Sequence, residues 1–100
     1  MTVALKRFYA HVAAQPCLKC GRYGCEVAHV RVMPSAKSSD FLPRRHGASE
    51  FAAIPLCPNH HRLLENSIHV LGEQKFMDSL GKPQCWVHGY VARLIAEAFA

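Results

Sequence analysis

Two short motifs in the chain place sulfur and nitrogen ligands at a regular spacing, Cys17-x-x-Cys20 and Cys57-x-x-His60. A two-residue spacer lets a tight turn direct both side chains at one ion, and Gly21 gives the first turn the backbone freedom that it needs. The combined pattern, CxxC followed by CxxH, therefore predicts one structural zinc site. A redox-active CxxC is the alternative interpretation, but it leaves Cys57 and His60 without a role.

Three further histidines lie beside these motifs or inside apolar sequence: His29, His61 and His69. Imidazole titrates near neutral pH and binds divalent metals, so these residues are candidates for chemistry that the zinc ion does not perform. Each also has a plainer interpretation. His29 could be a core histidine bonded to the backbone, and His61 could be an exposed residue of a helix. The residues between His61 and His69 could form a loop that turns His69 away.

The sequence also predicts the elements that must position these side chains. Helices are expected over residues 2–14, from Pro58 to about Asn66, around Phe76 to Leu80, and over residues 86–99. Two strands that pair with each other are expected at residues 26–33 and 51–56, separated by a long polar loop at residues 35–50. We therefore expect one small α+β domain that spans residues 1–100.

Length and composition indicate a small soluble domain that a metal ion would help to stabilise. One hundred residues bury a modest core, and an ion that joins residues far apart in the chain would add to it. No stretch approaches the roughly twenty apolar residues of a membrane span, and the N-terminus lacks a secretory pattern. Five cysteines favour metal over disulfides in a reducing compartment, so we expect a cytoplasmic protein. Cys25 is an alternative zinc ligand, and Cys85 is expected to be a small buried side chain.

The charge of the chain is positive, with a net value of +5. Most of the excess lies between Cys17 and Arg62, where only Glu26, Asp40 and Glu50 oppose the basic residues. These basic residues are Lys19, Arg22, Arg31, Lys37, Arg44, Arg45 and Arg62. A basic surface around a metal site suits a substrate with a phosphodiester backbone.

The order of these motifs resembles that of the HNH (ββα-metal) endonucleases in their zinc-containing form. It is most similar to the phage RecA-dependent recombination-enhancement (Ref-like) nucleases. The resemblance covers about residues 15–82 and rests on Cys17-x-x-Cys20, Ala28-His29-Val30-Arg31, Ile54-Pro55-Leu56-Cys57-x-x-His60-His61-Arg62, and Ile68-His69 followed by Gly72 and Phe76. The fold that it implies is a small zinc-stapled ββα-metal domain with flanking helices at about residues 2–14 and 86–99.

The resemblance also implies roles for the three remaining histidines. His29 would be the general base that takes a proton from the attacking water, and His61 and His69 would bind the catalytic divalent cation, Mg²⁺ or a similar ion. The substrate would be DNA, with contacts from Arg31, Lys37, Arg44, Arg45 and Arg62. A RecA-type recombinase filament would be a partner, and the protein would come from a phage or prophage in a bacterial cell.

The chain departs from the HNH pattern immediately before His29. Many HNH proteins carry a metal-binding Asp or His at that position, whereas this chain has Ala28. Asp40, His46 or an Asn outside the usual register could complete the metal shell instead. The departure keeps open the alternative of a catalytically inactive, zinc-stabilised module that binds DNA or protein. A thiol redox protein with a reversible disulfide between Cys17 and Cys20 is the third interpretation.

Overall fold

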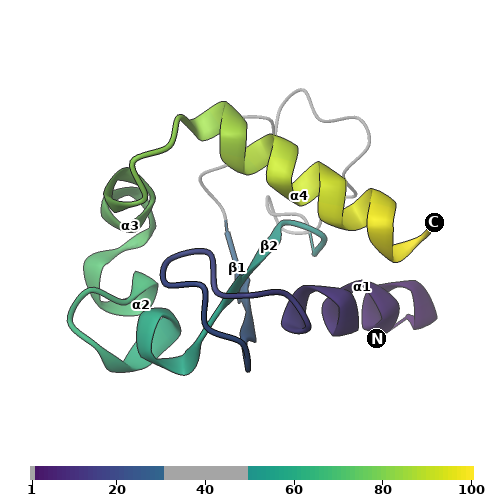
Figure 1. Cartoon of the computed structure of the whole chain (residues 1–100), viewed down its shortest axis with the longest axis horizontal. Coiled ribbons are helices and arrows are strands. Elements are labelled where there is room, and N and C mark those ends of the chain that lie inside the picture. Colours follow the sequence, from purple (N-terminus) through teal and green to yellow (C-terminus); the bar gives the residue numbers. More distant parts are fainter. Residues whose placement is uncertain (1, 31–49) are drawn as a thin grey trace.

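The computed structural model describes residues 2–30 and 50–100 of the chain (Figure 1). These residues form a two-stranded antiparallel sheet, four α-helices and one short π-helix, in an α+β arrangement. In chain order the elements are α1 (Val3–Ala13), β1 (Glu26–His29), β2 (Ala53–Leu56), the π-helix η2 (Asn59–Leu63), α2 (Ile68–Leu71), α3 (Glu73–Ser79) and α4 (Gln84–Ala98). None of the helices in the two described ranges is both long enough and apolar enough to cross a lipid bilayer.

The hairpin of β1 and β2 lies at the centre of the molecule. Glu26 pairs with Leu56 at one end of the sheet, and His29 pairs with Ala53 at the other. Every residue of β2 is buried, whereas β1 buries Ala28 and exposes His29. In Figure 1, α1 lies on one side of the hairpin, α2 and α3 lie on the other, and α4 runs across the hairpin between the two sides. The exposed end of β1 can therefore carry a functional side chain while β2 anchors it to the core.

Two groups of buried side chains hold the helices against the hairpin. Phe8 and Val12 of α1 pack with Ala53 of β2 and with Leu94 and Ala98 of α4. A second group joins the hairpin to α3 and α4, and it includes Ile54, Leu56, Phe76, Val87 and Val91. The helical spacing of these residues, at intervals of three and four, gives each helix one apolar face, which is what the sequence predicts.

The structure confirms the two predicted strands and most of the predicted helices, with differences in their limits. The first strand covers Glu26–His29, and the rest of its predicted range, residues 31–33, lies outside the described residues together with nearly all of the predicted loop. The second strand begins at Ala53 instead of residue 51. The expected helix after Pro58 is a π-helix of five residues. The sequence does not predict α2, because its four residues are little more than one helical turn and show no period.

Candidate functional site

The four residues of the predicted zinc site come together beside the sheet, and we call them the cysteine–histidine group. Their ligand atoms, the sulfurs of Cys17, Cys20 and Cys57 and a ring nitrogen of His60, all lie within 4.8 Å of one another. Nδ1 of His60 is 3.3 Å from Sγ of Cys57, and the sulfurs of Cys20 and Cys57 are 3.8 Å apart. A tetrahedral zinc site separates its ligand atoms by about 3.5–3.8 Å. The group therefore fits a metal ion such as zinc.

The first half of the group sits on a tight turn. The amide of Gly21 donates to the carbonyl oxygen of Cys17 at 2.8 Å, and Gly21 has a φ of +79°, a value that favours glycine. The amide of Lys19 also donates to Sγ of Cys17. Burial alone would raise the pKa of Cys17, but hydrogen bonds from the Cys57, Cys20 and Lys19 backbones outweigh it and leave this pKa lowered. These hydrogen bonds, from the turn and from Cys57, thus favour the thiolate form that binds metal.

The second half of the group begins where β2 ends. The amides of His60 and His61 both donate to the carbonyl oxygen of Cys57, at 3.0 and 2.8 Å. The amide of Leu64 donates to the carbonyl oxygen of Asn59, the five-residue step that defines a π-helix. Successive side chains on a helix point in different directions. His60 therefore faces the thiols while His61 faces a separate pocket.

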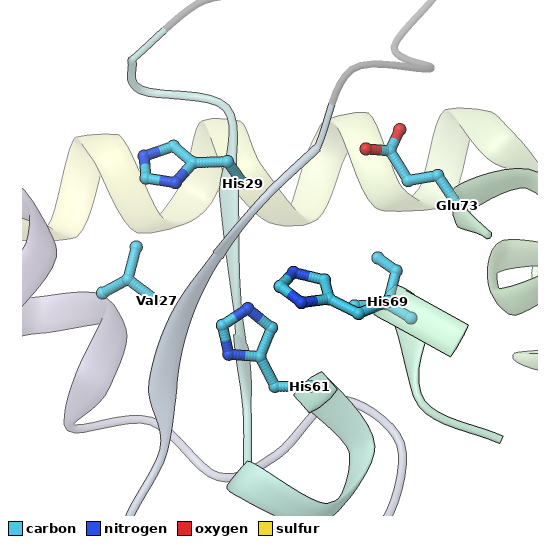
Figure 2. A pocket seen from close by; sticks show the side chains of 6 residues that line it. Val27, His29, His61, His69 and Glu73 are labelled. Atoms are coloured by element: carbon cyan, nitrogen blue, oxygen red, sulfur yellow. The ribbon is translucent and has the colours of Figure 1, made fainter. Parts of the chain in front are cut away.

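This pocket is open, has a volume of about 450 Å³ and contains all three histidines that the zinc motif left unexplained. Its lining consists of Val27, His29, His61, Ile68, His69 and Glu73, most of which Figure 2 labels. The rings of His61 and His69 meet edge to face, with their centroids 4.5 Å apart. Figure 2 shows His29 across the pocket from these two rings. The pocket therefore combines imidazoles from the hairpin, from η2 and from α2.

His29 is held at its place by a tyrosine of α1. Its Nε2 is 2.7 Å from the hydroxyl oxygen of Tyr9, and the two rings meet edge to face at 5.3 Å. The same hydroxyl donates to the carbonyl oxygen of Glu50 at 2.8 Å. Burial, followed by the charge of Glu50, raises the pKa of Tyr9, so the hydroxyl keeps its proton at neutral pH.

His61 is held by a carboxylate of β1. Its Nδ1 is 2.8 Å from Oε1 of Glu26. Arg62 makes two hydrogen bonds to the same carboxylate: its Nε donates to Oε1 at 3.1 Å and its Nη2 donates to Oε2 at 3.0 Å. Hydrogen bonds from Arg62 and then from His61 lower the pKa of Glu26 to about 2. Glu26 is therefore fully ionised at neutral pH.

His69 owes its position to the caps of α2. Ser67 is buried, and its hydroxyl accepts a hydrogen bond from the amide of Val70. At the other end, Gly72 adopts a φ of +90°, so the chain can leave α2 and begin α3 at once. This sharp junction places Glu73, the first residue of α3, at the rim of the same pocket.

The predicted DNA contacts are only partly described. Arg31, Lys37, Arg44 and Arg45, and with them Asp40 and His46, lie outside the described residues. Arg62 does lie in the described part, where its guanidinium is paired with Glu26 as above.

Cys25 and Cys85, the two remaining cysteines, both lie outside the cysteine–histidine group. Cys25 is outside the cysteine–histidine group, and its thiol is 3.3 Å from the carbonyl oxygen of Arg22. The expectation that Cys85 is buried is wrong, since its side chain is exposed. Cys85 lies two residues before Val87, about 200° around α4 from the buried face.

Sequence reasoning missed three residues that shape the pocket: Tyr9, Glu26 and Glu73. Tyr9 reads as one more apolar position of a helix, and Glu26 as one of a few acids among basic residues. The partners of Tyr9 and Glu26 are 20 and 35 residues away in the chain, so no local pattern identifies these two residues.

Comparison of the chain with protein-family models, with curated proteins and with solved structures found no match.

Proposed function

We propose that this chain is a metal-dependent endonuclease that hydrolyses DNA phosphodiester bonds with a ββα-metal (HNH) arrangement. The observation that carries the proposal is the convergence of His29, His61 and His69 on one open pocket beside the cysteine–histidine group. The histidines come from a β-hairpin and from the helical segments that follow it, in the order that the HNH resemblance implies. In this proposal zinc in the cysteine–histidine group is structural, and the chemistry belongs to the pocket.

The donor atoms of the pocket suggest which catalytic cation it would take. His61 and His69 offer imidazole nitrogens, and Glu73 offers a carboxylate at the rim. Imidazole suits first-row transition metals, whereas Mg²⁺ prefers oxygen ligands and keeps several waters. Mn²⁺ or Ni²⁺ are therefore proposed as cofactors beside Mg²⁺. A bound cation would neutralise charge on the scissile phosphate and stabilise the leaving oxygen.

His29 is the proposed general base. It is exposed at the end of β1, across the pocket from His61 and His69, where a phosphate could lie between them (Figure 2). Its ring would accept a proton from water as the water oxygen attacks phosphorus and the bond to the leaving oxygen breaks. A positioned base of this kind contributes about 10² to 10⁴-fold to the rate.

The substrate and partners follow from charge and from resemblance. The net charge of +5 supports a polyanionic substrate such as DNA. A RecA-type recombinase filament as partner, a phage or prophage origin and a place in the bacterial cytoplasm rest on the resemblance alone.

A plasmid-nicking assay tests the proposal, run with Mg²⁺, Mn²⁺ or Ni²⁺ and without a divalent cation. His29→Ala should lose cleavage by about 10² to 10⁴-fold while zinc content, folding and DNA affinity stay unchanged. His61→Ala should fail differently, because weaker cation binding is partly restored by more cation. His11→Ala is the matched control, since His11 pairs with Glu97 of α4, does not line the pocket and should have no effect on cleavage.

A His29→Ala protein that cuts at the wild-type rate would refute the assignment of the base. The assay also addresses a second candidate, the inactive zinc-stabilised module that binds DNA or protein. Ala28 favours this candidate, because its side chain is buried in the core and brings no ligand to the pocket. Wild-type protein that binds DNA but cuts with none of the three cations, with or without a recombinase filament, would decide for the binding module.

A further inference from the structure

Two histidines of the pocket, His29 and His61, contact protein partners through different ring nitrogens. A neutral imidazole has one nitrogen that donates and one that accepts, so a partner that fixes one nitrogen also fixes the other. His29 is engaged through Nε2 and His61 through Nδ1. The partners of these two nitrogens therefore determine what each ring can offer to the pocket.

The Tyr9 hydroxyl can only accept a hydrogen bond from His29. The Tyr9 hydroxyl has one proton, and the carbonyl oxygen of Glu50, 2.8 Å away, has no proton to give. That proton is therefore used on Glu50, and Tyr9 presents a lone pair to His29. At 2.7 Å, Nε2 of His29 must be the donor. In the neutral ring the lone pair that can take a proton then lies on Nδ1.

The partner of His61 imposes the opposite arrangement. An ionised carboxylate is an acceptor only, so Nδ1 of His61 must donate to Glu26 across their 2.8 Å contact. Arg62 bonds to both oxygens of this carboxylate and keeps it from rotating away. The neutral ring of His61 consequently carries its lone pair on Nε2, the form of imidazole that binds a metal.

From these contacts we infer that Tyr9 and Glu26 are positioning residues that hold His29 and His61 in opposite tautomers, with the proton on Nε2 of His29 and on Nδ1 of His61. In Figure 2 the ring of His61 directs one nitrogen toward His29 and His69 and turns the other away. The inference rests on the proposed function in one respect: it makes His29 ready to accept a proton through Nδ1 and His61 ready to bind a cation through Nε2. With the reversed tautomers, His29 would direct an N–H group at the water whose proton it should accept. His61 would direct an N–H group at the cation that it should bind.

Long-range ¹H–¹⁵N NMR of the zinc-loaded full chain, at a pH where the rings are neutral, reads the tautomer of each histidine directly. Wild-type protein should show His29 protonated on Nε2 and His61 protonated on Nδ1. Glu26→Ala should shift His61 toward the Nε2–H form and leave His29 unchanged. Tyr9→Phe should turn His29 into a mixture of both forms and leave His61 unchanged, so each variant is the control for the other.

Cleavage kinetics supply a second readout. Glu26→Ala should raise the divalent concentration needed for half-maximal cleavage by about 10 to 100-fold, the usual loss when the partner of a metal-binding histidine is removed. Tyr9→Phe should lower the rate at saturating cation without changing the concentration required.

The wild-type spectrum decides the inference even if a variant fails to fold. His61 protonated on Nε2, or His29 protonated on Nδ1, would overturn it. The expected tautomers in a protein that never cuts DNA would refute the nuclease and leave the two positioning roles standing.

Discussion

A Cys57→Ser substitution removes one thiolate from the cysteine–histidine group with little change in side-chain volume. A serine hydroxyl stays protonated at neutral pH and is a poor zinc ligand. Cys57 is buried at the end of β2, and Cys25, whose thiol is 3.3 Å from the carbonyl oxygen of Arg22, lies outside the group. We therefore expect the variant to lose its metal and, with it, the stabilisation that the metal gives.

The separation of the ligands sets the size of this loss. A metal bound to the group joins Cys20 to Cys57, which are 37 residues apart in the chain. Cross-linking a loop of this length stabilises the fold by about 4 kcal/mol through the entropy of the unfolded chain. Domains of this size have unfolding free energies of about 5–15 kcal/mol, so the metal would supply a large share. A loss of this size lowers the melting temperature by roughly 15–30 °C.

Thermal unfolding followed by circular dichroism, together with elemental analysis for zinc, measures the effect. The melting temperature of Cys57→Ser should equal that of wild-type protein in the presence of a chelator. Adding the chelator to Cys57→Ser should not lower its melting temperature further. Cys85→Ser is the matched control, because this exposed thiol should leave zinc content and melting temperature unchanged. A Cys57→Ser protein with one zinc per chain and the wild-type melting temperature would refute the assignment of the ligands.

Two further predictions concern pH and salt. Nε2 of His88 is buried without a hydrogen-bond partner among the described residues, and burial lowers the pKa of this histidine. The unfolded chain therefore takes up a proton at a higher pH than the folded protein, so stability should fall as the pH drops below the ordinary histidine pKa of about 6.5. Urea unfolding should show a smaller pH dependence in His88→Gln than in wild type, and equal dependence would contradict the idea. Replacing Arg44 and Arg45 by alanine should weaken binding to all DNA sequences alike and flatten its salt dependence by about one phosphate per lost contact. An unchanged salt dependence would show that Arg44 and Arg45 make no phosphate contacts.

The parts of the fold that the sequence predicts are those with a local signal. The spacing of Cys17, Cys20, Cys57 and His60 predicts the metal ligands because each half is contained in four residues. The period of apolar residues likewise predicts α1 and α4, whose buried faces are long enough to show it. Short elements have no such signal, which is why α2 was not predicted and why η2 was expected to be an ordinary helix.

The parts of the site that the sequence does not predict depend on tertiary contacts. That His29, His61 and His69 share one pocket follows from the pairing of β1 with β2 and from the Gly72 junction, since both place distant segments side by side. The partner of His61 depends further on the register of the sheet. A shift of β1 by one residue would turn Glu26 to the opposite face and remove its carboxylate from reach.

The turn after Cys57 has a thermodynamic consequence. It places a ligand of the cysteine–histidine group, His60, and a residue of the pocket, His61, next to each other, with both amides bonded to one carbonyl oxygen. An ion held by His60 would therefore restrain His61, so the two metal sites would be coupled if the pocket binds a cation as proposed. Coupling between binding equilibria is reciprocal: whatever factor zinc adds to the affinity of the pocket for its divalent cation, that cation adds to the affinity for zinc. On the proposed function, a cell short of zinc would lose folded protein and, in the molecules still folded, affinity for the second cation as well.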